Sequence, residues 1–180
     1  MFPYGTQNVG EASVLAAFSH SGVIRELILR LKFGGEKHIA AELVRLSLQT
    51  WEKLPSCNDT IVPVPVSPER LKERGYNQAA LLARAVCSQT GAKYMDILQR
   101  QNGVSQIGKS GVERSKNISG KFNLKSNSML SGTVWLIDDV LTTGATLTEV
   151  LSVLSDEGIN EVQPFVVCFQ KLGNGIIIPS

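Results

Sequence analysis

The residues with the clearest chemical potential are two adjacent acids, Asp138 and Asp139, which follow the apolar run Val134–Ile137. A short continuous apolar run is typical of a strand covered on both faces, and open α/β sheets bind ligands at the carboxyl ends of such strands. The two carboxylates are therefore candidate acceptors for the hydroxyl groups of a ligand or candidate ligands of a divalent ion. Taken alone, they are also compatible with a metal-binding pair in another α/β fold.

A threonine- and glycine-rich turn, Thr142–Thr146, follows the acids and leads into a helix expected from Ala145 to Asp156. A glycine lets the backbone approach an anion closely, and the free amides of a first helical turn donate hydrogen bonds to it. The turn taken alone could be no more than a capped helix start. Joined to the acids at this spacing, it predicts a site for a sugar phosphate with free vicinal hydroxyls.

A second polar segment follows the apolar residues 60–66. Ser67-Pro68 is typical of a helix start, because serine caps the first amides and proline fits the first helical position. The basic side chains of the following turn alternate with Glu69 and Glu73, so they form either a solvated helix face or a binding surface for an anion. These basic residues are Arg70, Lys72 and Arg74.

Residues 99–121 contain four glycines and, with five basic residues against one acidic residue, carry a net charge of +4. No helical or strand period organises them, so we expect a long polar loop, and such loops are usually functional or disordered. The segment 103–110 also satisfies the P-loop pattern GxxxxGK[ST], which raises a P-loop NTPase as an alternative. The apolar face that should follow Lys109-Ser110 on a helix is missing, and Gly111 disfavours that helix.

The remaining sequence predicts the elements that must position these residues. Amphipathic helices are expected at 22–32 and 36–51, a helical turn at 68–74, and a further helix at 78–89 that Asn77 can cap. Strands are expected at 60–66, 94–98, 133–137 and 162–169. Strands that alternate with helices indicate right-handed βαβ units and a mostly parallel sheet. Pro63 and Pro65 cannot donate to a strand ladder, so their strand must face an edge there or end. A chain of 180 residues predicts one domain with one core.

Composition excludes several classes of protein. Hydrophobic residues make up 43% and the net charge is +2, which gives no support for a nucleic-acid-binding tail, an acidic arm or disorder. No run approaches the ~20 apolar residues of a membrane span, and no basic residue precedes Arg25, so we expect a cytoplasmic protein without a signal peptide or a membrane partner. Three scattered cysteines and two histidines predict neither a disulfide framework nor a zinc site.

The segment 134–146 closely resembles the phosphoribosyl-pyrophosphate signature of the type I phosphoribosyltransferases. The blocks LKFGGEKHIA (31–40), IVPVPVSPERLKERGYNQ (61–78) and ERSKNISGKF (113–122) resemble those of the ComF/GntX-like branch. Many members carry a cysteine-rich zinc-binding module in front, which this sequence lacks. The resemblance implies a single-domain, Rossmann-like α/β fold with a mostly parallel sheet flanked by helices, a long flexible loop, and a small hood from residues 1–20 and the C-terminal tail.

The resemblance also assigns roles to individual residues. Asp138 and Asp139 would accept hydrogen bonds from the ribose hydroxyls, and Val140 and Leu141 would shape the turn that follows. The 5-phosphate would be held by Thr142, Thr143, Gly144, Ala145 and Thr146. The pyrophosphate would be bound by Ser67, Arg70, Lys72 and Arg74, and the loop would close over the substrate through Arg100, Lys109 and Arg114. Of these residues, Asp138, Asp139, Arg74 and Lys109 are predicted to act in catalysis.

By the same resemblance, the expected activity is magnesium-dependent transfer of phosphoribose from 5-phosphoribosyl 1-pyrophosphate to a nitrogen acceptor, with release of pyrophosphate. Mg²⁺ would be bound mainly through the pyrophosphate, and no protein metal ligand is assigned. An alternative is a regulator that binds phosphoribosyl pyrophosphate without turnover, or an adaptor of the competence (DNA uptake) machinery. The sequence identifies neither the acceptor nor the oligomeric state, so a homodimer stays open.

Overall fold

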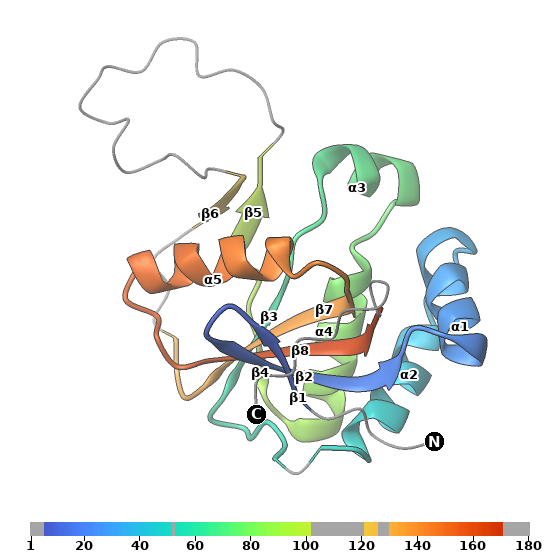
Figure 1. Cartoon of the computed structure of the whole chain (residues 1–180), viewed down its shortest axis with the longest axis horizontal. Coiled ribbons are helices and arrows are strands. Elements are labelled where there is room, and N and C mark those ends of the chain that lie inside the picture. Colours follow the sequence, from blue (N-terminus) through green and yellow to red (C-terminus); the bar gives the residue numbers. More distant parts are fainter. Residues whose placement is uncertain (1–5, 52, 102–120, 126–129, 171–180) are drawn as a thin grey trace.

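The structure is a computed structural model, and it describes residues 6–51, 53–101, 121–125 and 130–170. Its centre is a six-stranded sheet in the order β1-β2-β8-β7-β3-β4, with a separate two-stranded ribbon, β5-β6 (Figure 1). In the central sheet only β1 and β2 pair antiparallel, and the other neighbours run parallel, which confirms the mostly parallel sheet. The strands are β1 (Thr6–Val9), β2 (Ala12–Ser19), β3 (Thr60–Pro63), β4 (Lys93–Tyr94), β5 (Leu98–Arg100), β6 (Phe122–Leu124), β7 (Val134–Leu141) and β8 (Val162–Phe169).

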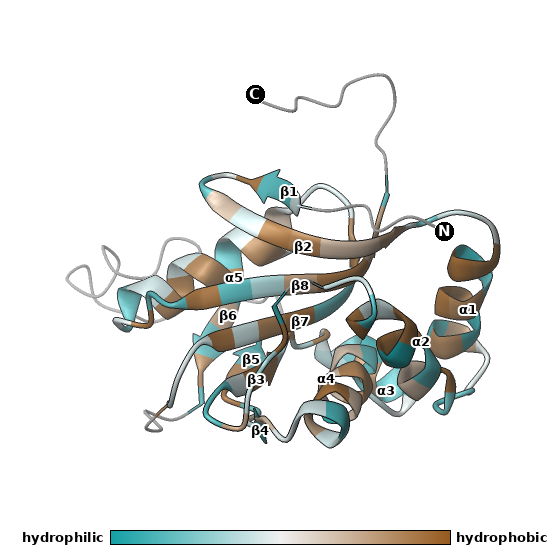
Figure 2. Ribbon diagram, turned by 90° about the horizontal axis from the view of Figure 1, so that it is seen from below, coloured by the Kyte–Doolittle hydropathy of each residue, from teal (hydrophilic) through white to brown (hydrophobic). Residues whose placement is uncertain are grey.

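Helices cover both faces of this sheet (Figure 2). One face packs against α1 (Gly22–Phe33), α2 (Ile39–Leu48) and α4 (Gln78–Thr90), and the other against α5 (Ala145–Asp156). The short helix α3 (Pro68–Arg74) follows β3 beyond the edge of the sheet. The predicted helices are thus confirmed, although α2 is shorter at both ends than expected.

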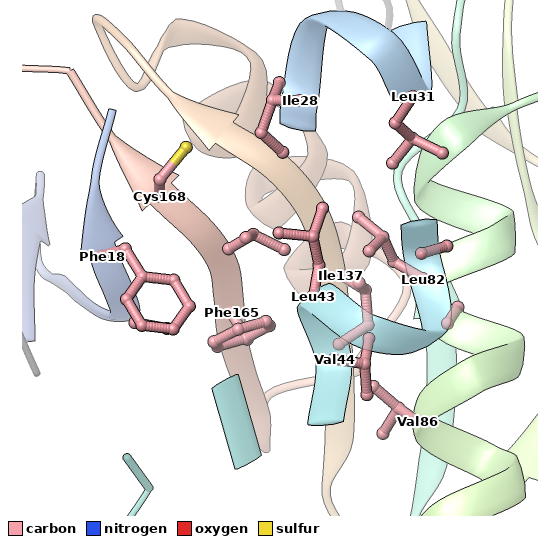
Figure 3. Packing of buried hydrophobic residues seen from close by; sticks show 14 of the residues in the cluster. Phe18, Ile28, Leu31, Leu43, Val44, Leu82, Val86, Ile137, Phe165 and Cys168 are labelled. Carbon is pink, nitrogen blue, oxygen red and sulfur yellow. The ribbon is translucent and has the colours of Figure 1, made fainter. Parts of the chain in front are cut away.

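The alternation of side chains along β7 divides the core into two layers, because successive strand residues point to opposite faces. Trp135 and Ile137 join the layer under α1, α2 and α4, part of which Figure 3 shows, while Val134 and Leu136 join the layer under α5. All four are at most 2% exposed. The continuous apolar run that predicted a doubly covered strand is therefore explained by helices on both sides.

The proline in β3 lies where its missing N–H costs no hydrogen bond. Val64 N–H donates to Ile137 O across the β7 side, so the neighbouring Pro63 nitrogen faces the β4 side. The last hydrogen bond on that side runs from Met95 N–H to Ile61 O, before Pro63 is reached. Of the two predicted alternatives, an edge or a strand end, the structure has the strand end: β3 stops at Pro63 and is shorter than the predicted strand at 60–66.

Three sequence expectations need correction. Residues 6–19, assigned to a hood, form β1 and β2, and β2 lies inside the sheet beside β8. A strand predicted at 94–98 is replaced by β4 and β5, which lie in different sheets. The base of the predicted loop is a β-ribbon in which Leu98 and Phe122 are buried. The rest of that loop, with Lys109, Arg114 and the GxxxxGK[ST] pattern, lies outside the described residues, as do residues 1–5 and 171–180.

No helix in the described part of the chain combines the length and the apolar character that crossing a membrane would require.

A buried carboxylate ties the amino-terminal ends of β3 and β7 together. Asp59 Oδ2 accepts hydrogen bonds from Ser56 N–H (2.7 Å) and Ser56 Oγ (3.0 Å), and Asp59 Oδ1 accepts one from Thr133 N–H (2.9 Å). Burial raises the pKa of Asp59, but these hydrogen bonds outweigh it, so the pKa is lowered below its ordinary value. The carboxylate is therefore the form that the fold stabilises.

Asp59→Ala is expected to reduce the free energy of unfolding at neutral pH by roughly 2–3 kcal/mol, because buried donors lose a charged acceptor. Since the folded-state pKa is lowered, this stabilisation is present above the unfolded-state pKa and is lost as the pH falls through the folded-state pKa. Urea titrations at several pH values measure it. The control is Asp96→Ala, which removes an exposed ion pair to Lys125 and should cost at most about 1 kcal/mol. Equal losses for the two variants would contradict the prediction.

Candidate functional site

The candidate site lies at the carboxyl edge of the parallel sheet. There β3 pairs with β7 only as far as Pro63 opposite Ile137, so β7 continues beyond its neighbour from Asp138 to Leu141. The chain that leaves β3 enters α3, and the chain that leaves β7 enters α5 (Figure 1). Both acids are part of β7 and do not follow it, which differs from the expectation that the strand ends before them.

The turn between β7 and α5 presents backbone amides at the first turn of a twelve-residue helix. Thr142, Thr143 and Ala145 are exposed. The first backbone hydrogen bond back into the turn is donated by Thr148 N–H to Gly144 O, at 2.9 Å. Within the described residues the amides of Thr146 and Leu147 have no acceptor, and that of Ala145 has only a long bond (3.4 Å) to Thr143 Oγ1. Free amides at a helix start bind anions, so this turn can hold a phosphate.

Gly144 is the N-cap of α5 and has φ +80°, a left-handed conformation that favours glycine. A Cβ atom placed on it would lie 2.7 Å from Val9 Cγ1. The end of the β1-β2 hairpin therefore packs directly against the turn. Both the backbone conformation and this contact require glycine here.

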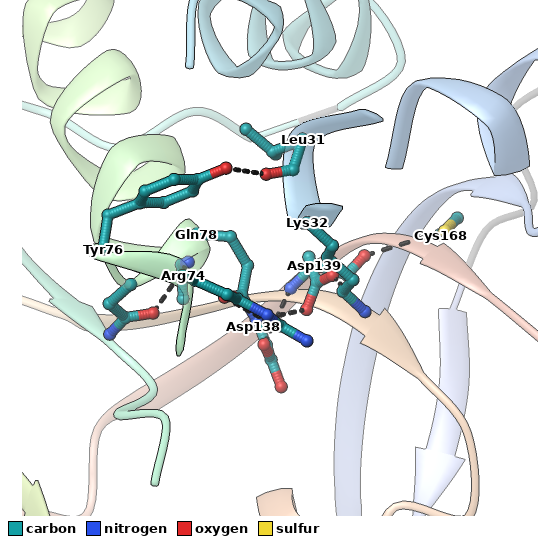
Figure 4. Close-up of polar contacts among 10 residues, drawn as sticks. Leu31, Lys32, Arg74, Tyr76, Gln78, Asp138, Asp139 and Cys168 are labelled. Atoms are coloured by element: carbon teal, nitrogen blue, oxygen red, sulfur yellow. Dashed lines mark hydrogen bonds and ion pairs between the residues drawn. The ribbon is translucent and has the colours of Figure 1, made fainter. Parts of the chain in front are cut away.

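The carboxylate of Asp139 is buried and held by two helices. Asp139 Oδ2 lies 2.5 Å from Lys32 Nζ of α1, and Asp139 Oδ1 accepts a 3.4 Å hydrogen bond from Gln78 Nε2 of α4 (Figure 4). Its carbonyl accepts a weak bond from Cys168 Sγ at 3.7 Å, and burial raises the pKa of that thiol to about 12. Asp139 is 3% exposed. In this structure it is engaged with the protein and does not face solvent.

Asp138 occupies the opposite face of β7, as the alternation of side chains requires. The residue as a whole is partly exposed, and Asp138 Oδ1 accepts a 2.8 Å hydrogen bond from the Asp139 amide. Burial, and after it the nearby charge of Asp139, raises the pKa of Asp138 well above its ordinary value. The two acids are therefore unequal: Asp139 has its counter-ion in Lys32, and Asp138 has a carboxylate oxygen free for a ligand.

Asp138→Asn is expected to make the fold more stable at pH 7. Because the folded-state pKa of Asp138 is raised, the folded protein binds more protons than the unfolded chain above pH about 4, and wild-type stability falls as the pH rises through that range. Asparagine removes this dependence, so the advantage of the variant should vanish below pH about 4. Urea unfolding of both proteins at the two pH values tests this, with the exposed Asp156→Asn as control. A variant that is less stable than wild type at pH 7 would contradict it.

The predicted pyrophosphate residues separate into two groups. Ser67 caps α3 by accepting a hydrogen bond from the Arg70 amide (3.3 Å), and the side chains of Arg70 and Lys72 lie exposed. Arg74 is partly buried: its Nη1 donates to Gln78 Oε1 at 3.0 Å, and its guanidinium lies 4.8 Å from the centre of the Phe33 ring. The structure thus connects only Arg74 of these basic residues to the acid pair.

Arg100 is the last residue of β5 and pairs with Phe122, and its guanidinium lies 5.2 Å from the centre of the Phe122 ring. The hydrogen bonds that Glu69 accepts from its own amide and from Ser67 lower the pKa of Glu69, and the charge of Arg100 adds to this effect. Just before β6 the Lys121 amide donates to Glu149 Oε1 of α5 at 3.0 Å, so this end of the ribbon is attached to α5.

Two residues of the site were missed or undervalued by the sequence reasoning. The sequence predicts Lys32 only as the end of an amphipathic helix, and it leaves Gln78, beside the Asn77 cap, open between a structural role and a role in the site. Both lie within blocks that resemble the ComF/GntX-like branch, which was the one available signal. Their partner Asp139 is 107 and 61 positions away in the sequence, so no local pattern reveals the contacts.

This chain is similar in sequence to known competence proteins. No protein-family model matches the chain. Competence protein F of Haemophilus influenzae is 35% identical over 154 residues, 76% of this chain and 64% of that protein. Competence protein ComFC of Bacillus subtilis is 34% identical over 146 residues, 79% of this chain and 58% of that protein. The chain thus spans about three fifths of the length of these relatives.

Among solved structures, the allosteric regulatory enzyme of purine biosynthesis matches with a TM-score of 0.50 and 18% identity, over 74% of this chain and 25% of the enzyme. A solved adenine phosphoribosyltransferase also matches, with a TM-score of 0.43 and 12% identity over 77% of this chain and 71% of the enzyme. At 18% identity the likeness to the first of these structures concerns the fold alone.

Proposed function

We propose that this chain binds 5-phosphoribosyl 1-pyrophosphate at the carboxyl edge of its sheet. The proposal starts from its homology to the ComF competence proteins and from its type I phosphoribosyltransferase fold. We propose that it transfers the phosphoribosyl group to a nitrogen acceptor. The observation that supports this best is that the Asp138 carboxylate and the free amides of Thr146 and Leu147 stand on the two sides of one turn, which joins β7 to α5 at the carboxyl edge of the sheet. The first suits ribose hydroxyls and the second suits the 5-phosphate.

In the proposed reaction the lone pair of the acceptor nitrogen forms a bond to C1, and the bond between C1 and the pyrophosphate oxygen breaks. The pyrophosphate leaves with the electron pair of that bond, and the acceptor nitrogen loses its proton to solvent. Negative charge grows on the leaving group, and in this proposal it is stabilised by the guanidinium of Arg74, which Gln78 connects to the acid pair. Asp138 and the amides of the Thr142–Thr146 turn fix the sugar, so that the acceptor meets C1 in the required orientation.

Mg²⁺ is part of the proposal, bound mainly through the pyrophosphate oxygens. When bound, it would neutralise charge on the leaving group. The oxygen chemistry of the site fits such a hard cation, because the Asp138 carboxylate, whose Oδ1 alone accepts a hydrogen bond within the described residues, is a suitable additional donor. Asp139 is less suited, since Lys32 already neutralises it.

A second candidate is a protein that binds phosphoribosyl pyrophosphate without turnover and serves a cytoplasmic step of DNA uptake. It is favoured by the names of the relatives, which are competence proteins, and by the engagement of Asp139 with Lys32. Such an adaptor would have a protein or DNA partner and could act as a homodimer. Its ligand site would be the same, so the two candidates differ in turnover and not in binding.

One assay separates them: incubation with labelled phosphoribosyl pyrophosphate, Mg²⁺ and a panel of nitrogenous bases, with detection of pyrophosphate. Release that falls at least about 100-fold in Asp138→Asn, but not in the exposed Asp156→Asn, supports the transferase. Tight binding without release for any base supports the non-catalytic protein. Failure to bind phosphoribosyl pyrophosphate would contradict both.

A further inference from the structure

We propose that Gln78 is a positioning residue, which orients the Arg74 guanidinium for the pyrophosphate group while leaving its positive charge free. This proposal rests on the function proposed above and deepens it. It assigns a role to a neutral side chain that touches neither the sugar nor the phosphates. Its basis is a series of contacts from β7 through α4 to α3 and α1 (Figure 4).

The side-chain amide of Gln78 connects a buried acid with a partly buried base. Its Nε2 donates to Asp139 Oδ1 at 3.4 Å, and its Oε1 accepts from Arg74 Nη1 at 3.0 Å. Gln78 is 4% exposed, so solvent does not compete for these bonds. An amide has one donor end and one acceptor end, and here the acid fixes the donor end. The carbonyl end therefore has a fixed direction, and Arg74 is oriented by it.

The position of Gln78 is itself fixed by the start of α4. Asn77 caps this helix by accepting a hydrogen bond from the Ala79 amide at 3.0 Å. The Asn77 Nδ2 also donates to Val64 O at 3.0 Å, which joins the helix start to the segment that leaves β3. Gln78 is therefore held in a fixed position relative to the edge of the sheet, and this position sets the direction from which its carbonyl oxygen contacts Arg74.

Among these side chains the acid is paired with Lys32 and the Arg74 guanidinium is not paired with any acid, which favours binding of an anion by Arg74. Lys32 Nζ lies 2.5 Å from Asp139 Oδ2, so Asp139 has its counter-ion without Arg74. No carboxylate within the described ranges lies at ion-pair distance from Arg74. A carboxylate at position 78 would neutralise the guanidinium, whereas the amide orients it and leaves its charge for the ligand.

The opposite support of Arg74 is also neutral. Its guanidinium lies 4.8 Å from the centre of the Phe33 ring, whose phenylalanine is 64% exposed. The negative face of an aromatic ring attracts a cation without cancelling its charge. Arg74 is therefore held by an amide and by a ring, and it remains a free cation at the edge where α3 borders the site.

The test is isothermal titration calorimetry of the full chain with two probes, inorganic pyrophosphate and ribose 5-phosphate, each with Mg²⁺. In Gln78→Leu and Gln78→Glu the affinity for pyrophosphate is expected to fall about tenfold or more, the scale of one lost charge-assisted contact. The affinity for ribose 5-phosphate should stay within about twofold, because Asp138 and the Thr142–Thr146 turn are unchanged. Arg74→Met gives the full contribution of the guanidinium, and the exposed Gln89→Leu on the same helix is the matched control.

The results distinguish a failure of the proposed function from a failure of the positioning role of Gln78. If wild type binds neither probe, the proposed function fails and the role of Gln78 fails with it. If wild type binds both and the Gln78 variants do too, or if they lose both probes equally, the positioning role is wrong and the proposed function stands. Should Gln78→Leu not fold, the isosteric Gln78→Glu decides, with circular dichroism as the check on folding.

Discussion

Lys32→Met is expected to lower the free energy of unfolding by roughly 3–5 kcal/mol, the usual cost of leaving a buried carboxylate without its counter-ion. The side chain of Asp139 is 5% exposed and that of Lys32 21%, so the acid cannot reach water when its partner is removed. The Gln78 amide offers only a long hydrogen bond of 3.4 Å in compensation. Because Lys32 comes from α1, the variant should also loosen the packing of this helix on the sheet. Urea denaturation at neutral pH measures the loss.

A double-mutant cycle gives the control for this prediction. Asp139→Asn alone should cost less than Lys32→Met, because a partly exposed ammonium can regain water while a buried carboxylate cannot. The double variant Lys32→Met/Asp139→Asn should recover at least half of the loss, since no buried charge is then unpaired. A double variant as unstable as the sum of the two single variants would show that the ion pair is not the cause.

Gly144→Ala is expected to cost about 2–3 kcal/mol of stability and to weaken binding of ribose 5-phosphate more than tenfold. The positive φ of +80° strains any side chain with a Cβ atom, and the new atom would lie 2.7 Å from Val9 Cγ1. The turn can escape this overlap only by moving away from the β1-β2 hairpin. Movement of the turn shifts the amides of Thr146 and Leu147, which are the proposed phosphate donors. Calorimetry with ribose 5-phosphate and thermal unfolding together detect both effects.

Gly158→Ala is the matched control, because Gly158 lies beyond the other end of α5 with φ +79° and has nothing within 4 Å of its added Cβ. In that variant the backbone is strained but the added Cβ atom meets no neighbour. Its free energy of unfolding should therefore fall by about 1 kcal/mol, and its affinity for ribose 5-phosphate should be unchanged. A second check is Gly144→Ala combined with Val9→Ala, which removes the overlap and should recover part of the stability. Equal effects at positions 144 and 158 would show that the contact with Val9 is irrelevant.

The order of the helices and strands along the chain was predictable, because residues such as helix caps form their hydrogen bonds with partners only a few positions away in the sequence. Ser67 and Asn77 cap the helices that they were expected to cap, and each bond spans at most three residues. The apolar run before Asp138 predicted a strand covered on both faces. This prediction requires only that no polar side chain interrupts the run, which the sequence shows directly. The α/β class and the mostly parallel sheet follow from such signals.

The N-terminal strands escaped prediction for a physical reason. Residues 12–19 alternate poorly between apolar and polar, since both faces of β2 meet other parts of the protein. The sequence of β2 is therefore like that of any apolar segment. It lies beside β8 because residues 150 positions apart in the sequence pair with each other. The extension of β7 through its two acids was missed likewise, because β8 supplies the hydrogen bonds and is remote in sequence.

The sequence by itself determined which groups are present at the sheet edge: an acid pair, a glycine turn at the start of a helix, and basic residues after a neighbouring strand. Only the tertiary structure decided which of them are free. It ties Asp139 to Lys32 and Gln78, leaves Asp138 open, and selects Arg74 among three basic side chains. The reason is that residue type fixes what a side chain can bind, whereas burial and long-range partners fix whether that capacity is already used.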